Sequence, residues 1–182
     1  SSKGSKAMPE PLKLYHNPNS RAVTAHWMLE EASASYELVH VELREGGERD
    51  PKILAVNPMG KIPTLVLGDG TVLTETPAIL AWGADAHPDA GLAPALGSSE
   101  RGTYYRWLFF VGSAFEPALI ERMMRQDAGP LPKMALGWGS YDDVVDTIEA
   151  ALGDTAYLAG DRFTAADLYM SADLWWAGLF KA

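Results

Sequence analysis

Residues 57–67 read NPMGKIPTLVL, and residues 73–79 read LTETPAI. In the first stretch Pro63 directly precedes an apolar run that is typical of a buried strand. Proline cannot donate a hydrogen bond to a neighbouring strand, so its place before this run indicates a turn that enters the strand. In the second stretch a Glu-Thr pair stands before Pro77, and proline is favoured in the first turn of a helix. The two stretches therefore predict a turn that enters a strand, a further strand and a helix.

The pattern continues on both sides of these stretches as alternating strands and helices. Apolar residues at spacings of three and four indicate the first helix, and Gly-Asp-Gly at 68–70 indicates a hairpin. A helix between successive strands favours parallel pairing, and the hairpin adds an antiparallel edge. The predicted elements are a strand at 12–16, a helix at 20–32, a strand at 36–43, a short helix at 51–56, strands at 63–67 and 71–74, and a helix from Pro77 to about 86 with Thr76 as its N-cap.

The second part of the chain is predicted to be helical. Residues 87–99 are rich in Pro, Gly and Ala and indicate a domain boundary, and helices follow at about 99–126, 140–152 and 164–180. Thr164 is the expected N-cap of the last helix, and Asp167 completes a pattern close to a capping box, so both are predicted to serve folding. The predicted domains are a leader or cloning remnant at 1–11, an α/β domain at 12–87, a linker at 88–98 and an all-helical domain at 99–182.

The composition excludes several classes of site. The 182 residues carry a net charge of −9 and include no cysteine. A nucleic-acid partner needs clustered Lys and Arg, while disulfides, zinc–thiolate sites and cysteine nucleophiles need cysteine. The four histidines lack metal-ligand spacing, and no apolar run approaches the ~18 residues of a membrane span. We therefore expect a cytoplasmic protein without a metal, a nucleic-acid partner or a membrane partner, whose thiol chemistry, if any, uses a bound thiol.

The order of elements and motifs resembles the cytosolic glutathione S-transferase family. The motifs are NPMGKIP at 57–63, LTETPAI at 73–79 and GDRFTAAD at 160–167, within a β-α-β-α-β-β-α unit and a helical region. The resemblance covers the chain from about residue 12 to its end and favours bacterial-type members with Ser or Asn chemistry. It implies a thioredoxin-like domain, an all-helical domain, glutathione as co-substrate, a detoxifying role and usually a homodimer. Family members normally carry at least one more helix, so we expect an incomplete C-terminus.

The resemblance also implies where glutathione binds. A cis bond between Ile62 and Pro63 would expose the backbone of Ile62 to an extended peptide, and in the family this backbone pairs with the cysteinyl part of glutathione. The helix that begins at Pro77 offers free N–H groups and a positive dipole end to a carboxylate, while Glu75 suits an ammonium group. Glu75 and Thr76 therefore fit the γ-glutamyl group, although an ordinary N-cap beside an ordinary acid is the alternative.

Two cations are candidates for the glycyl carboxylate of glutathione. Lys61 directly precedes Ile62, and Arg44 lies in the loop after the second predicted strand. Both are also interpretable as solvated surface charges, and Lys61 ranks above Arg44 for the binding role.

The group that activates the thiol is predicted in the turn HNPNSR at 16–21. The thiolate is the nucleophile, and a hydroxyl donor at a helix N-terminus stabilises it. Family members carry Tyr, Ser or Cys in or near this turn, and Ser20 stands where certain Ser-type members carry serine. Asn17, whose amide N–H could donate, ranks second. Asn19 and His16 follow, and His16 lies near the position of the tyrosine in Tyr-type members. Ser20 is also interpretable as the N-cap of the first helix, and the two roles are compatible.

The second substrate is expected between the domains, against the aromatic-rich segment at 100–115. Phe109 and Ser113 lie on one predicted face of that helix and are candidate pocket residues, although a helical core explains the aromatic residues equally well. The predicted reaction is attack of the glutathione thiolate on an apolar electrophile. The alternatives are another glutathione-dependent reaction (isomerisation, dehalogenation, ether cleavage or peroxide reduction) and a non-catalytic protein that binds glutathione or apolar ligands.

Overall fold

The computed structural model describes residues 10–180 except 45, 126, 130 and 154. It divides into two compact units, Ser1–Ile79 and Leu80–Ala182. The leader predicted at 1–11 lies almost entirely outside the described residues. The linker predicted at 88–98 lies downstream of the division between the units and stays a prediction.

The first unit follows the predicted order of elements. Its elements, with the helix that continues into the second unit, are β1 (Leu12–His16), α1 (Ala22–Glu31), β2 (Tyr36–His40), α2 (Pro51–Leu54), β3 (Thr64–Val66), β4 (Val72–Leu73) and α3 (Thr76–Ala86). The β-α-β-α-β-β-α order predicted from the sequence is therefore confirmed. β1 has its predicted bounds, α3 begins one residue earlier than predicted, and the other elements are slightly shorter than predicted.

The sheet has the order β2-β1-β3-β4, and this corrects one prediction about strand direction. β1 and β2 are parallel, as the intervening helix predicts, but β3 pairs with β1 in the antiparallel sense. β3 lies on the far side of β1 from β2, so the segment that contains α2 crosses to another position in the sheet instead of returning beside β2. A helix between two strands therefore did not determine their relative direction here. The predicted antiparallel hairpin of β3 and β4 is confirmed.

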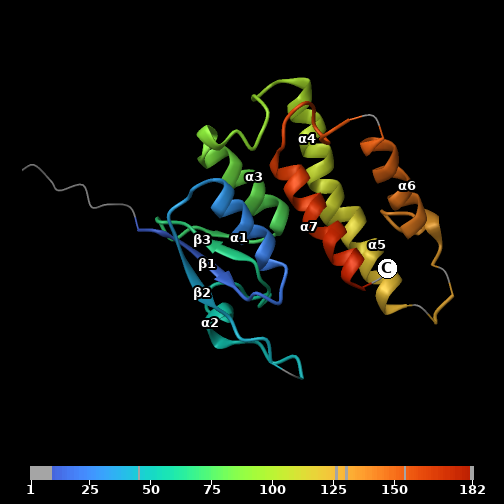
Figure 1. Ribbon diagram of the computed structural model, residues 1–182. Coiled ribbons are helices and arrows are strands. Elements are labelled where there is room, and N and C mark those ends of the chain that lie inside the picture. The colour runs from blue at the N-terminus through green and yellow to red at the C-terminus, as the bar shows by residue number, and fades with distance from the viewer. Residues whose placement is uncertain (1–9, 45, 126, 130, 154, 181–182) are drawn as a thin grey trace, which may run out of the picture. The chain divides into compact units, whose positions relative to one another are not determined.

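The core of the first unit lies between β1 and α1, which pack together (Figure 1). Leu14 of β1 and Leu65 of β3 are fully buried, as are Ala25, Met28 and Leu29 on the apolar stripe of α1. Complete burial of a leucine side chain contributes about 1.5–3 kcal/mol to folding. The spacing of three and four residues along α1 therefore places one face of the helix on the sheet, as the sequence predicts.

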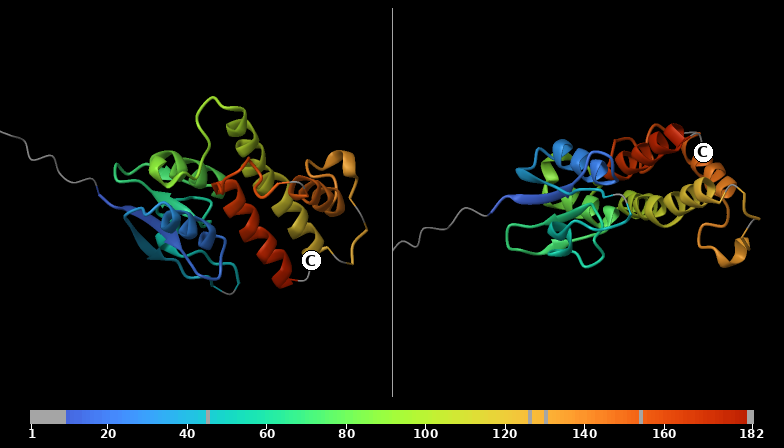
Figure 2. Two further views of the ribbon diagram at one scale, coloured as in Figure 1. Left: turned by 45° about the horizontal axis from the view of Figure 1, so that its top comes forward. Right: turned by 90° about the horizontal axis from the view of Figure 1, so that it is seen from below.

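The second unit is helical, which confirms the predicted class. Its elements after α3 are η1 (Pro88–Ala90), α4 (Ser99–Phe110), η2 (Val111–Phe115), α5 (Glu116–Met124), η3 (Lys133–Ala135), α6 (Tyr141–Leu152) and α7 (Ala165–Phe180). α7 packs along α4 and α5, and α6 packs on α5 (Figures 1 and 2). Tyr104, Leu108, Phe115 and Leu168 are fully buried in this bundle. No helix in the described part of the chain is long and apolar enough to cross a membrane.

The helix predicted at 99–126 is interrupted by the π-helical segment η2. Pro117 follows directly in the first turn of α5. Proline has no N–H to donate to the carbonyl four residues earlier, which is that of Ser113, and its ring clashes with that carbonyl. A wider π turn avoids the clash, and such turns occur often at functional sites. Pro117 was therefore the sequence signal for the interruption.

Thr164 and Asp167 hold the start of α7. One Asp167 oxygen accepts the Thr164 N–H and the Thr164 hydroxyl, each at 2.8 Å, and the other accepts the Leu158 N–H at 2.8 Å. The Asp167 half of the predicted capping box is therefore present, while the Thr164 hydroxyl donates to Asp167 instead of accepting its N–H. Both residues are buried, in keeping with the structural role predicted for them.

Candidate functional site

The sheet of the first unit gathers most of the predicted site residues at one end. Tyr15, near the end of β1, pairs with Thr64, where β3 begins. β2 runs parallel to β1, and β4 runs antiparallel to β3, so both end beside the start of β3. We call this place, where β1, β2 and β4 end and β3 begins, the Thr64 end of the sheet. The segments that meet there are 17–20, 41–44, 61–63 and 74–76.

Two helices begin at the same end. α1 starts at Ala22, separated by one residue from the 17–20 turn, and α3 starts at Thr76, separated by two residues from β4. The first N–H groups of a helix lack partners within the helix and carry a partial positive charge. The Thr64 end therefore suits a ligand that carries negative charge at more than one point.

The 17–20 turn is fastened to the segment that follows β2. Val41 donates its N–H to the carbonyl of His16 at 2.9 Å, and the Asn17 amide Nδ2 donates to the carbonyl of Val41 at 2.8 Å. Asn17 also accepts the N–H of Asn19 through Oδ1 at 2.9 Å, and only 7% of its surface is exposed. Asn17 is therefore largely occupied in holding the turn.

Ser20 lies in the turn, one residue earlier than an N-cap. Its hydroxyl donates to the carbonyl of Asn17 at 2.7 Å, and its oxygen accepts the N–H of Ala22 at 3.2 Å. The N-cap position of α1 belongs to Arg21, which makes no side-chain cap bond, so the N-cap predicted at Ser20 is corrected by one residue. Ser20 still satisfies a first-turn N–H of α1, and it is half-buried. The Ser20 hydroxyl could redirect its donated hydrogen bond from the Asn17 carbonyl to an anion. Its oxygen would still accept the N–H of Ala22.

The loop at 57–64 is held by the Asn57 side chain, which sequence reasoning missed. The Asn57 amide donates to the carbonyl of Lys61 at 3.0 Å and to the Thr64 hydroxyl at 3.2 Å, and its oxygen accepts the N–H of Met59 at 3.0 Å. The Thr64 hydroxyl donates to the same Lys61 carbonyl at 2.9 Å. Both Asn57 and Thr64 are buried. Two sequence features could have indicated this network. Asn57 begins a turn, and Thr64 is a polar residue at the start of an otherwise apolar strand.

This loop presents the residues that the sequence predicted for peptide binding. The Ile62–Pro63 peptide bond is cis. Lys61 is exposed, Ile62 is half-buried and Pro63 is buried. The backbone of Ile62 lies just before the first paired residue of β3, where an extended peptide could add to the sheet.

Glu75 and Thr76 lie at the start of α3 with a distinctive backbone. Glu75 has a positive φ of 66°, which non-glycine residues seldom adopt and which occurs preferentially at functional sites. Its carbonyl accepts the N–H of Ile79 at 3.1 Å, so Glu75 occupies the capping position and Thr76 is the first helical residue. The N-cap predicted at Thr76 is therefore wrong by one residue. The exposed Glu75 carboxylate and the buried Thr76 lie together at the helix N-terminus.

Of the two cations predicted for a carboxylate, Arg44 is engaged with acids of its own loop. Arg44 Nε lies 3.4 Å from Glu42 Oε2, and Arg44 Nη1 lies 3.7 Å from Glu48 Oε2. Lys61 has no salt bridge to a described residue. The structure therefore favours Lys61 over Arg44 as the cation available to a ligand at this end.

The predicted pocket residues of the second substrate belong to the helical unit. Phe109 is 49% exposed and stacks on Tyr105, with ring centroids 6.0 Å apart. Ser113 is exposed within the π-helical segment, one turn further on. The two residues share a face of the α4–η2 helix, as predicted, and neither belongs to the buried core.

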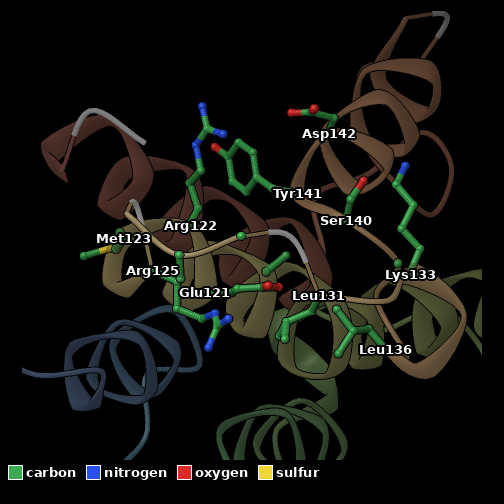
Figure 3. Close-up of a pocket in the computed structure, with 14 residues that line it drawn as sticks. Glu121, Arg122, Met123, Arg125, Leu131, Lys133, Leu136, Ser140, Tyr141 and Asp142 are labelled. Carbon is green, nitrogen blue, oxygen red and sulfur yellow. The ribbon is translucent and has the colours of Figure 1, made fainter.

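A cavity of about 560 Å³ lies elsewhere in the helical unit, between the end of α5 and the start of α6 (Figure 3). Arg122 stacks on Tyr141 at 5.5 Å, and Glu121 accepts a hydrogen bond from Trp138 at 2.8 Å. Lys133, on the cavity wall, pairs with Asp143 at 3.0 Å. Several charged groups of this cavity therefore have partners within the protein, and no predicted site residue lines it.

No group of three or more His, Asp or Glu side chains that could hold a metal ion occurs among residues 10–180 as far as they are described.

Comparisons with known proteins identify the family. Residues 10–82 match the glutathione S-transferase N-terminal domain, and residues 117–180 match the glutathione S-transferase C-terminal domain. Glutathione S-transferase GstA of Escherichia coli O157:H7 is 31% identical over 171 residues, which cover 93% of this chain and 84% of the relative. Glutathione S-transferase 3 of Zea mays is 36% identical over 167 residues, covering 86% of this chain and 74% of the relative.

A solved structure of a sphingomonad glutathione S-transferase in complex with glutathione has the same fold. Its TM-score is 0.74 at 33% identity, and the match covers 92% of this chain and 83% of that one. Together with the two-unit architecture and the arrangement at the Thr64 end, these matches establish the relationship. The chain belongs to the glutathione S-transferase family.

Proposed function

We propose that this protein is a glutathione transferase that binds glutathione at the Thr64 end of its first unit and uses the thiolate to attack an apolar electrophile. The observation that carries the proposal is the meeting of two helix N-termini, the 17–20 turn and the loop at 61–63 at one end of the sheet. The names of the relatives and the glutathione complex of a related structure support it. A cytoplasmic homodimer with a detoxifying role belongs to the same proposal, on the ground of family membership.

The γ-glutamyl group of glutathione would bind at the start of α3. Its carboxylate would accept hydrogen bonds from the free N–H groups of the first turn and from the hydroxyl of Thr76. Its ammonium group would face the exposed carboxylate of Glu75. The positive φ of Glu75 sets the direction of that side chain, so the two ends of one amino acid would be recognised by two neighbouring residues.

The rest of the tripeptide would follow the loop before β3. The cysteinyl backbone would pair with Ile62, and the glycyl carboxylate would lie near Lys61, with Arg44 as a weaker alternative because of its two glutamate partners. The network of Asn57 and Thr64 fixes the carbonyl of Lys61 and so holds this stretch in one conformation. Such preorganisation lowers the entropy cost of binding an extended peptide.

The sulfur would then lie near the 17–20 turn at the start of α1. The Ser20 hydroxyl would turn its hydrogen from the Asn17 carbonyl to the thiolate and keep the bond from Ala22. The thiol proton passes to solvent, the sulfur lone pair forms a carbon–sulfur bond, and the leaving group departs with its bonding electrons. Asn17 ranks second as the donor because its amide already holds Val41. Phe109 and Ser113 are the proposed wall of the electrophile site.

The ionisation of bound glutathione tests the proposal. Absorbance of the thiolate is measured against pH in the wild type, in Ser20→Ala and in Ser35→Ala, an exposed serine outside the site. A hydrogen bond to a charged group contributes about 1.5–3 kcal/mol, so Ser20→Ala is expected to raise the pKa of the bound thiol by about one to two units. Conjugation with a nitroaryl chloride is expected to fall roughly 10- to 150-fold in parallel. An unshifted thiol in the wild type would contradict the proposal, and equal pKa values in all three proteins would remove Ser20 from it.

A further inference from the structure

The side chain of His16 is buried at a position that the proposed reaction does not use. His16 is the last residue of β1, and 8% of its surface is exposed. Its Nε2 has no hydrogen-bond partner among the described residues. Buried polar atoms are nearly always paired, so an unpaired ring nitrogen next to the 17–20 turn calls for a functional explanation.

The groups that face this ring come from α1 and β2. His26 of α1 lies edge-on to His16, with ring centroids 5.0 Å apart, and His40 of β2 is the register partner of His16 in the sheet. Tyr36 of β2 donates to the carboxylate of Glu30 and therefore accepts from His26 Nε2, 2.8 Å away. Glu30, the acid of this cluster, therefore accepts a hydrogen bond from Tyr36.

The backbone of His16 and its neighbour Asn17 form the attachment of the turn. The carbonyl of His16 accepts the Val41 N–H, and the Asn17 amide donates to the Val41 carbonyl. Asn17 in turn accepts the hydroxyl of Ser20 through its backbone carbonyl. A displacement of the His16 ring from its buried site would therefore be passed to Ser20 through two consecutive residues and their hydrogen bonds.

We infer that His16 is a positioning residue whose neutral ring holds the 17–20 turn in the form that binds glutathione, and that protonation of the ring releases the turn. The inference rests on the proposed function, and it assigns His16 a role different from direct contact with the sulfur. A charged imidazolium in this site would lack an acceptor at Nε2 among the described residues and would lie beside His26 and His40. Burying an unpaired charge costs several kcal/mol, so the charged ring leaves its site.

The electrostatics agree with this geometry. Burial is the main cause that holds the pKa of His16 below its ordinary value of 6.5, and His26 and then His40 lower it further. The buried position disfavours a proton on the His16 ring. The turn that binds glutathione is therefore fully stable above pH 6.5, and its stability falls progressively as the pH drops below 6.5. Burial and the bond to Glu30 raise the pKa of Tyr36 to about 12, so Tyr36 keeps its proton and Glu30 keeps its partner throughout this range.

The test uses S-methylglutathione, which has no thiol to ionise and whose carboxyl groups ionise ordinarily below about pH 4. Its affinity for the full chain is measured by calorimetry between about pH 7 and about pH 5. Wild type is expected to lose at least ~3-fold in affinity, since one linked proton changes an affinity by at most about tenfold per pH unit. His16→Phe, which cannot gain a proton, is expected to bind with nearly constant affinity. His87→Gln, in the second unit, is the matched control and is expected to behave like the wild type.

Two further measurements keep the outcome decisive if His16→Phe does not fold. The His16 ring is titrated by nuclear magnetic resonance in the wild type and is expected to gain its proton below pH 6.5. His40→Gln removes a side chain that lowers the pKa of His16, so it is expected to move both the ring titration and the affinity loss to slightly higher pH. A constant wild-type affinity, a His16 ring that titrates at or above 6.5, or an unchanged loss in a folded His16→Phe would overturn the inference. Failure of S-methylglutathione to bind even at pH 7 would instead overturn the proposed function.

Discussion

Two loops meet at the Thr64 end of the sheet, and they are built in opposite ways. In the loop at 57–64, the Asn57 amide and the Thr64 hydroxyl bind each other and the same backbone carbonyl, so their polar atoms are paired within the protein. In the 17–20 turn, the Ser20 hydroxyl donates a hydrogen bond to the Asn17 carbonyl that it could instead donate to a ligand. The adjoining His16 ring has a nitrogen, Nε2, without a hydrogen-bond partner among the described residues. Under the proposals above, the first loop would be a fixed frame for a peptide backbone, whereas the turn would respond to a ligand and to pH. Recognition and activation would then rest on separate segments.

The largest effect is expected from Asn57→Ala. The substitution leaves the Met59 N–H without its acceptor and the Thr64 hydroxyl without a donor in a buried place. Unpaired buried groups cost about 1–3 kcal/mol each, so the free energy of unfolding is expected to fall by about 3 kcal/mol, as measured in urea. Asn19→Ala, on an exposed side chain of the other loop, is the control and should change it by less than about 0.5 kcal/mol. Equal losses in the two variants would contradict the distinction between a fixed loop and an adaptable turn.

Much of this arrangement could be predicted from local patterns. The strand at 12–16, the hairpin and the order of elements follow from alternation, turn residues and helical spacing, which are properties of neighbouring residues. The assignment of Ile62 and Glu75 to the proposed site came from family motifs. Local patterns and motifs together therefore sufficed for the fold class and for the residues proposed to bind glutathione.

The remaining features depend on contacts between distant residues. The antiparallel direction of β3 is fixed by its pairing with β1, which no local pattern records. Asn57 reads as a turn residue, and its role appears only when Thr64 and Lys61 are brought beside it. The isolation of His16 likewise depends on α1 and β2 together. Sequence patterns therefore could not predict the side-chain networks at the Thr64 end of the sheet.

A smaller effect is expected from Thr64→Val, which removes the hydroxyl and keeps the shape of the side chain. The Lys61 carbonyl keeps its bond from Asn57, so the free energy of unfolding is expected to fall by only about 1–2 kcal/mol. Because the loop loses part of its preorganisation, KM for glutathione should rise several-fold while kcat stays nearly unchanged. Thr64→Ser restores the hydroxyl and should restore KM. A fall in kcat with unchanged KM would place Thr64 in the activation of sulfur and would break the separation of the two loops.

The smallest change in stability is expected from Glu75→Gly, and its sign is the reverse of the others. Glycine adopts the positive φ of this position without strain, so the free energy of unfolding is expected to rise by about 0.5–1 kcal/mol. Removal of the carboxylate that would face the ligand ammonium should at the same time weaken glutathione binding by up to roughly fivefold. Ser33→Gly is the matched control, because Ser33 also has a positive φ, of 49°, but lies in the exposed turn between α1 and β2. It should gain similar stability and bind glutathione normally. If Glu75→Gly bound as well as Ser33→Gly, the unusual backbone at the start of α3 would be a feature of the fold alone, and the ammonium group would need another partner.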